Sequence, residues 1–416
     1  MVERGLGREA NAIRGMDARL LRLARLGAPV LAAGLLVVLA IGLAPGAEPG
    51  LDRSGAVLGH DLSQVWVAGR TALSGRGSEV YDVARHDAAV VELFGPAARF
   101  RWHYPPVYLL PAAALASMPY LAAVAAWAAG SLALFALAMR RATGRMDATI
   151  MALAHPLVFT SAGYGQNSLV TAALLTVGLT SLDRRPVLAG IAFGLVCYKP
   201  QLAGLAPLLC LLTGRWTCLL ASAGSAALVA GGSAAAFGIE PWIAFVHSVP
   251  ATNEAILRDA IAGLDLNASG FGAVRLLGGS VGLASAFQVA VSAAAIVATA
   301  LVWRRTDHAT LRAAATLMAA PLMSPYVPVY DLAPLVPGAV LLAMGARGGL
   351  TGAERAFLIG TVLLGAALRP AIEITGMPLG FGLAAVGFGL AIRRALGPRA
   401  LGSSARPAAA GSPRPA

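Results

Sequence analysis

Charged residues are scarce in this 416-residue sequence. Only 12% of its residues are Asp, Glu, Lys or Arg, whereas 57% are hydrophobic and the mean hydropathy is +0.72. Soluble domains carry about 25% charged residues, so the composition excludes a water-soluble globular enzyme. Cysteine is also rare. The three cysteines (Cys197, Cys210 and Cys218) lie in apolar stretches without metal or disulfide spacing, and we interpret them as small core hydrophobes.

Lysine is nearly absent. Lys199 is the only lysine among the 32 basic residues. The 31 arginines are spread between apolar runs and form no single basic patch, which argues against nucleic-acid binding. The sequence also lacks Rossmann and P-loop fingerprints, a serine nucleophile elbow, and a His, Asp or Glu cluster with convincing metal-ligand spacing. We therefore expect no cofactor and no metal site.

Long apolar runs fill most of the chain instead. A bilayer is crossed by about 20 apolar residues, so the runs predict an all-α integral membrane protein with about 12 transmembrane helices. Several runs have only 13 to 15 residues and are expected to be tilted, broken or re-entrant. The run at 106–139 contains Pro119 and is either one bent crossing or a re-entrant segment followed by a crossing. The runs cover approximately residues 28–44, 106–139, 147–163, 168–182, 186–199, 201–213, 216–236, 282–303, 310–323, 328–346, 355–368 and 377–392.

The distribution of arginine predicts the orientation, since short cytoplasmic loops concentrate basic residues. With residues 1–26 inside and one crossing per run, the inside carries 22 basic and 7 acidic residues, and the outside 10 basic and 13 acidic. Both ends are then cytoplasmic, and the first run is expected to be an uncleaved signal anchor. The predicted organisation is a cytoplasmic segment at 1–26, a membrane domain at 27–394 with outer loops at 45–105 and 237–281, and a disordered cytoplasmic tail at 395–416.

The first outer loop is expected to carry two helices. One is a short amphipathic helix on the membrane surface that ends before Gly75 and Gly77, and the other spans residues 86–94. The first of them follows from apolar positions at helical spacing, namely Leu62, Val65, Trp66, Gly69 and Leu73.

Unusual polar strings gather at the predicted outer ends of the runs. Polar residues at membrane depth are costly and usually line a cavity or a pathway. Charges at the rim suit chemistry at the interface better than a transport site at the midplane. The strings are Gly59-His60-Asp61, Arg101-Trp102-His103-Tyr104-Pro105-Pro106, Gly163-Tyr164-Gly165-Gln166-Asn167, Tyr198-Lys199-Pro200-Gln201 and the segment from Ser324 to Asp331.

In order and spacing, these strings resemble glycosyltransferase family 87 of the GT-C superfamily, which includes α-1,2-mannosyltransferases of phosphatidylinositol mannoside synthesis. The resemblance runs from Asp61 to Asp331. It implies a GT-C-like membrane enzyme that moves a sugar from a polyprenyl-phosphate donor to a lipid or glycan acceptor, at the periplasmic face of the bacterial inner membrane. Mannose is one candidate sugar, although this chain has Tyr326, Tyr330 and Asp331 where the mannosyltransferases carry a histidine-containing string.

The resemblance also implies that Asp61 is the catalytic acidic residue, and we predict it to be the general base of an inverting transfer. Burial near an apolar surface would raise its pKa towards a useful value. Asp61 and Gln64 also fit a helix N-cap with its capping-box partner, so both interpretations stay open. For the leaving phosphate, the candidates are Lys199, Arg101 and His103. The alternatives are a snorkelling anchor for Lys199 and a headgroup contact for Arg101.

The remaining candidate substrate-binding residues are Tyr104, Gln166, Asn167, Gln201, Tyr326 and Asp331. Asn167 also fits an N-cap of the helix that begins at Ser168, and interfacial tyrosines are common in membrane proteins of any function. The rival function is a transporter or lipid-carrier flippase in which the same strings line the path. Transport favours ionisable residues near the midplane and paired broken helices, and the sequence shows neither clearly.

Overall fold

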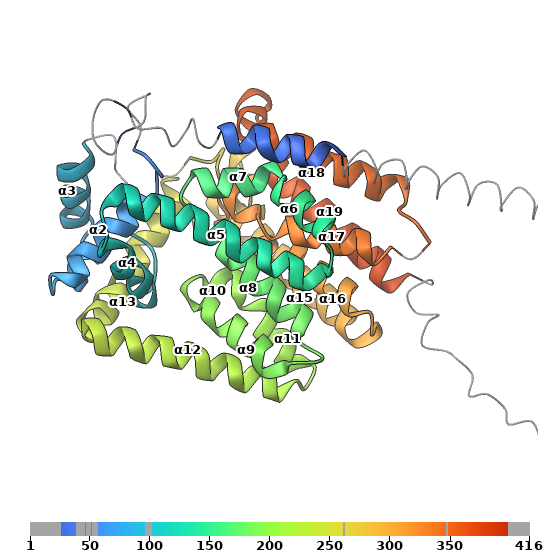
Figure 1. Cartoon of the computed structure of the whole chain (residues 1–416), viewed down its shortest axis with the longest axis horizontal. Helices are drawn as coiled ribbons and strands as arrows, with labels where there is room; N and C mark the ends of the chain where they lie inside the picture. The colour runs from blue at the N-terminus through green and yellow to red at the C-terminus, as the bar shows by residue number, and fades with distance from the viewer. Residues whose placement is uncertain are drawn as a thin grey trace, which may run out of the picture.

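The computed structural model describes residues 26–38, 46, 51, 57–95, 102–260, 263–346 and 348–397. In these residues all regular secondary structure is helical (Figure 1). The strand-like pairings in this part of the chain are two isolated bridges, Leu51 with Val57 and Asn267 with Pro328. The prediction of an all-α chain is therefore confirmed.

Within the described residues, five helices are long and apolar enough to cross a membrane. They are α5 (Tyr120–Thr143), α12 (Trp216–Phe237), α15 (Val281–Arg305), α18 (Gly352–Thr375) and α19 (Leu379–Leu396). Shorter apolar helices cover Leu26–Val38, Pro106–Ala116, Ser168–Ser181, Pro186–Tyr198, Ala309–Met323 and Val329–Met344. A helix of about 14 residues reaches only about 21 Å, less than the bilayer core of about 30 Å. The chain is thus a membrane protein by its apolar helices, and the count of twelve crossings stays a prediction.

The other helices are short, and several begin at proline or end at or next to glycine. They are α2 (Leu62–Leu73), η1 (Gly77–Tyr81), α3 (Val83–Phe94), η2 (Pro106–Tyr108), α4 (Leu109–Ala116), α6 (Met146–Leu153), α7 (Pro156–Gly163), α8 (Ser168–Ser181), α9 (Pro186–Gly194), η3 (Leu195–Tyr198), α10 (Pro200–Ala203), α11 (Leu205–Leu212), α13 (Glu240–Asn253), η4 (Glu254–Arg258), α14 (Gly270–Leu276), α16 (Ala309–Ala319), η5 (Ala320–Met323), η6 (Val329–Leu332) and α17 (Leu335–Met344).

Several apolar runs are broken within their length. The run at 147–163 is divided at Pro156, which begins α7 at a position where the missing N–H of proline costs nothing. The run at 106–139 is two helices, because α4 ends at Ala116 and α5 begins after Pro119. α4 packs closely on α2, since a Cβ on Gly69 would lie 2.1 Å from the carbonyl oxygen of Ala112. The run is thus divided at Pro119, and the choice between one bent crossing and a re-entrant segment followed by a crossing stays open.

The two helices expected in the first outer loop are present as α2 and α3. α3 begins earlier than expected, because the Asp82 carboxylate accepts hydrogen bonds from the N–H groups of Ala84 and Arg85. α2 is not a surface helix. Every residue from Leu62 to Gly69 is buried, whereas Leu73 is 56% exposed. The expected amphipathic helix is corrected to a core helix, because α4 covers a side that the sequence pattern leaves open.

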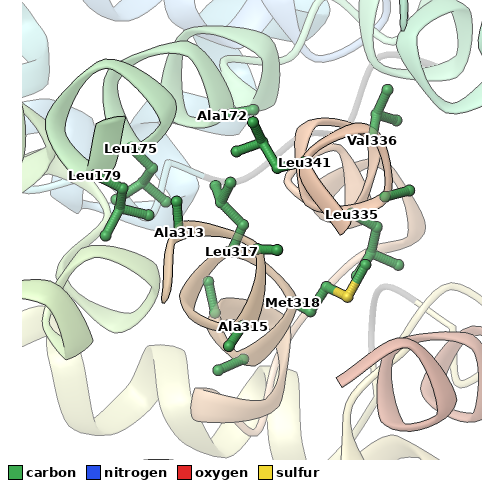
Figure 2. Close-up of a cluster of buried hydrophobic side chains, with 14 of the residues drawn as sticks. Ala172, Leu175, Leu179, Ala313, Ala315, Leu317, Met318, Leu335, Val336 and Leu341 are labelled. Carbon is green, nitrogen blue, oxygen red and sulfur yellow. The ribbon is translucent and has the colours of Figure 1, made fainter. Parts of the chain in front are cut away.

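The core consists of two apolar clusters. The larger one includes α8, α16 and α17, whose side chains interdigitate in Figure 2. The second cluster surrounds α2, α4 and α5 and extends to Tyr198. The polar strings lie where the clusters meet, since Tyr104 and Tyr198 belong to the second cluster and Val329 and Leu332 to the first.

Candidate active site

A tight turn positions Asp61 at the start of α2. Gly59 has a φ of +72° and His60 a φ of +41°, a conformation that glycine adopts easily and histidine seldom. The Asp61 side chain makes no capping hydrogen bond to α2. Its Oδ2 atom instead accepts a hydrogen bond from the Gln166 amide nitrogen. The capping-box interpretation of Asp61 is therefore wrong.

A second turn, between α7 and α8, brings Gln166 to Asp61. Gly165 has a φ of +64°, and a Cβ at this position would lie 2.3 Å from the carbonyl oxygen of Gly59 and 2.8 Å from the Leu62 Cβ. Only glycine allows the two turns to pack together this closely. Gln166 Oε1 accepts a hydrogen bond from the Tyr104 hydroxyl at 3.1 Å. The amide is therefore held at both ends, and it fixes the orientation of the carboxylate.

A buried ion pair lies beside this network. Lys199 Nζ is 2.6 Å from Asp331 Oδ1, and both side chains are about 5% exposed or less. The Ser168 hydroxyl donates to the same Asp331 oxygen. The Lys199 ammonium also lies 5.9 Å from the centre of the Tyr330 ring. Lys199 follows η3 and Asp331 lies in η6, so two short helical turns position the pair.

The environment of Asp61 makes it more basic than an ordinary aspartate. Burial has the largest effect and raises the pKa of Asp61 to about 6. Hydrogen bonds from Gln166 and Tyr330 and the positive charge of Lys199 lower this pKa, but by less. The negative charge of Asp331 raises it further. At neutral pH Asp61 is mainly ionised, and it has a pKa close to that of an effective general base.

Aromatic side chains form the walls around the charged groups. Tyr104 and Tyr108 have ring centres 4.4 Å apart, and Tyr108 and Tyr198 5.2 Å apart. Tyr164 lies 5.6 Å from Tyr330 on another side. The Asn167 amide is buried next to the Tyr104 and Tyr108 hydroxyls, without a hydrogen bond of standard geometry to the described residues. Asn167 makes no side-chain capping bond to α8, so its amide is directed to the two tyrosine hydroxyls instead of the helix.

Most of the predicted site residues come together. Burial, together with the charges of Asp61 and Asp331, raises the pKa of Tyr326, so this tyrosine lies in the same electrostatic environment. Gln201 is exposed and takes part in none of these hydrogen bonds. His103 lines a neighbouring cavity, and Arg101 lies outside the described residues. The residues that the structure gathers are Asp61, Tyr104, Gln166, Asn167, Lys199, Tyr326 and Asp331.

Sequence reasoning missed two residues of this region, Ser168 and Arg369. Ser168 adjoins the predicted Asn167, and that adjacency was the available signal. Arg369 had no such signal. Its guanidinium lies 3.5 Å from the Tyr164 hydroxyl, and both residues line a cavity of about 220 Å³. In the described part of the chain, no third His, Cys, Asp or Glu joins Asp61 and Asp331 in a metal-binding group.

The sequence model of glycosyltransferase family 87 matches residues 102–325, just over half of the chain. The chain belongs to glycosyltransferase family 87. The family predicted from the polar strings is thereby confirmed, and the protein is a membrane glycosyltransferase. No curated protein and no solved structure matches it. The matched range of this family 87 member contains Tyr104, Gln166 and Lys199, while Asp61 and Asp331 lie on either side of it.

Proposed function

We propose that this glycosyltransferase moves a sugar from a polyprenyl-phosphate donor to a hydroxyl of a lipid or glycan acceptor, at the periplasmic face of the bacterial inner membrane. One observation carries the proposal: a buried carboxylate held by Gln166 lies within the electrostatic influence of the only lysine. Such a transfer requires a base for the acceptor and positive charge for the departing phosphate.

Asp61 is the base in this mechanism. It takes the proton of the acceptor hydroxyl while the hydroxyl oxygen bonds to the anomeric carbon of the donor sugar. The bond between that carbon and the phosphate oxygen breaks, and the phosphate leaves with the electron pair. A single displacement of this kind inverts the anomeric centre. Gln166 positions the carboxylate, because its amide is fixed by Tyr104.

Lys199 supplies positive charge on the side of the leaving phosphate. Asp331 and Ser168 hold the ammonium in place but also offset its charge. Arg369, which lies beside Tyr164 and pairs with Asp265 and Glu373, is assigned as a second cation near the site. The amide of Asn167, which lies beside the Tyr104 and Tyr108 hydroxyls, and the hydroxyl of Tyr326 are assigned to the sugar, for which mannose stays one candidate.

The test is Asp61→Asn in purified full-length protein, because asparagine keeps the shape of the side chain and removes its basicity. We expect transfer of radiolabelled sugar to fall by roughly 10²- to 10⁴-fold. The matched control is Asp183→Asn, which changes a carboxylate that pairs with Arg215 and Arg312 at the far end of α8 instead of facing Gln166. Transfer at the wild-type rate by Asp61→Asn would show that Asp61 is not the base.

A flippase predicts a different product. A transferase releases free polyprenyl phosphate in proportion to the glycosylated acceptor, whereas a flippase leaves the sugar-lipid intact. Comparing lipid extracts of cells with and without the gene then identifies the acceptor, because the lipid or glycan lacking one sugar accumulates when transfer is lost.

A further inference from the structure

A second cavity adjoins the Asp61 cluster. It has a volume of about 460 Å³, within the range of about 300–1,000 Å³ that is usual for ligand sites. Its walls come from η1, α3, α13 and the segment at Trp102. The Tyr81 hydroxyl donates to the Tyr104 carbonyl oxygen at 3.0 Å, and the Trp102 ring lies 5.3 Å from the Tyr104 ring. Two residues of the cavity wall therefore touch the tyrosine that holds Gln166.

The cavity contains a buried histidine without a partner. His86 is 3% exposed, and neither of its ring nitrogens has a hydrogen-bond partner in the described residues. Asp87 Oδ1 is also buried without a partner there. Buried polar atoms are nearly always hydrogen-bonded in native proteins, so these atoms indicate that a ligand with hydroxyl groups completes them. Trp102 adds an apolar aromatic surface beside them.

The described lining favours an uncharged ligand over an anion. Asp82 and Asp87 line the cavity together with three histidines, and no lysine or arginine is among its described lining residues. Burial and the neighbouring His103 lower the pKa of His86 to about 4, so this ring is neutral at physiological pH. A phosphate therefore finds less positive charge here than beside Lys199. An uncharged molecule with many hydroxyls and an apolar face fits both the polarity and the aromatic wall.

We propose that this cavity binds an uncharged sugar unit of the acceptor, with His86 hydrogen-bonded to its hydroxyls and Trp102 against its apolar face. Its role in transfer rests on the proposed function, whereas the binding itself does not require Asp61. The acceptor hydroxyl is thereby brought to Asp61 from the side of Tyr104, and the donor phosphate lies on the side of Lys199.

α13 offers a matched pair of substitutions. Ala244 lines the cavity, whereas Val246 is 64% exposed. Ala244→Leu adds bulk inside the cavity, and Val246→Leu adds bulk outside it on the same helix. His86→Phe keeps a ring of similar size and removes both unpaired nitrogens. Because Phe suits a buried apolar position, we expect this variant to fold at least as well as the wild type, as judged by its melting temperature.

The experiment measures binding of methyl hexopyranosides to the full chain in nanodiscs by saturation-transfer NMR. We expect at least one hexoside to bind saturably. His86→Phe and Ala244→Leu should weaken this binding at least tenfold, and Val246→Leu should leave it unchanged. Inorganic phosphate is not expected to compete. The proposal fails if no hexoside binds, if both cavity variants bind normally, or if phosphate displaces the sugar.

The sugar-binding experiment does not depend on whether Asp61 is the catalytic base. If Asp61→Asn retains transfer while His86→Phe loses sugar binding, the proposed role of Asp61 fails and the sugar site stands. A second arm compares a soluble oligosaccharide with a glycolipid carrying the same glycan in vesicles. Tighter binding of the glycolipid identifies a lipid-linked acceptor, and equal binding a soluble glycan; either result requires the same cavity.

Discussion

Charged side chains gather at both ends of α8, but they are arranged in different ways. At its first residue, Ser168 bonds Asp331 in the candidate active site. Beyond its last residue, Asp183 pairs with Arg215 at 2.7 Å and with Arg312. The helix has 14 residues, so the two groups lie about 21 Å apart. One helix therefore connects a cluster rich in neutral donors to one rich in arginine.

The difference teaches how this chain separates structural carboxylates from a reactive one. Asp183 is flanked by two guanidinium groups, and its side chain is 40% exposed. Asp61 is held by the neutral amide of Gln166 and by Tyr330, in a site where burial raises its pKa. Arginine partners stabilise a carboxylate as an anion and make it a poor base. Neutral donors orient a carboxylate and leave it basic.

Breaking the Lys199–Asp331 pair should have the largest effect on the protein as a whole. Lys199→Met leaves the Asp331 carboxylate buried without its cation, which should lower the free energy of unfolding by about 3–5 kcal/mol. Thermal or denaturant unfolding in detergent measures this loss. The double variant Lys199→Met, Asp331→Leu should recover most of the stability while transfer stays low. If the double variant also recovers transfer, Lys199 has no role at the phosphate.

The contact between the two turns gives the next largest effect. Gly165→Ala forces a Cβ against the Gly59 carbonyl at a positive φ, a backbone strain of about 1–3 kcal/mol before any steric clash. We expect Gln166 to move from Asp61 and sugar transfer to fall at least tenfold. Gly144→Ala is the control, because Gly144 has a similar φ of +67° but no atom within 4 Å of the added Cβ. Equal activity of the two alanine variants would contradict the proposed importance of this contact.

Much of the candidate site could be predicted because its residues lie in short strings with unusual chemistry. The only lysine, and an amide pair after two glycines, are visible in an Arg- and Ala-rich sequence without any structure. The pairing of these strings was not predictable. Ser168 and Asp331 are 163 residues apart and Arg369 and Tyr164 are 205 apart, so only tertiary packing brings them together.

The fold, like the site, was predictable only in part. The lengths of the apolar runs predicted helices, and Pro119 marked the division between α4 and α5. The burial of α2 was hidden, because its apolar spacing fits a helix with one covered face. The structure covers the opposite face with α4, whose own apolar run resembled part of a membrane crossing. Periodicity describes one helix at a time, whereas burial depends on which helices meet.

The pH dependence of transfer tests the pKa of Asp61 directly. Because the base must be ionised, the rate should be half-maximal at about pH 6 and fall about tenfold per pH unit below it. Gln166→Leu removes a hydrogen bond that lowers this pKa, so its profile should shift to higher pH. Kinetic measurements from pH 4.5 to about 8 distinguish these curves. A midpoint near pH 4 would mean that Asp61 is ordinarily solvated.

The raised pKa of Asp61 also makes the stability of the folded protein depend on pH. The folded value is above the unfolded value of 3.8, so ionising Asp61 costs stability as the pH rises from about 4 to 6. Asp61→Asn should therefore melt at a higher temperature than the wild type above pH 6, and the two should converge below about pH 4. A constant difference across this range would contradict the raised pKa.

The smallest effect is expected at the arginine-rich end of α8. Asp183→Asn removes a charge that is 40% exposed and keeps an amide oxygen for Arg215 and Arg312. The pair with Arg215 is partly exposed, and such pairs contribute about 0–1 kcal/mol, whereas the buried Arg312 keeps the amide oxygen as its partner. The melting temperature should therefore fall less than in Lys199→Met, and sugar transfer should not change. A loss of stability as large as that of Lys199→Met would mean that both charged groups are structural. A small loss leaves the Asp61 carboxylate, held by the neutral amide of Gln166, as the feature that sets this end of α8 apart.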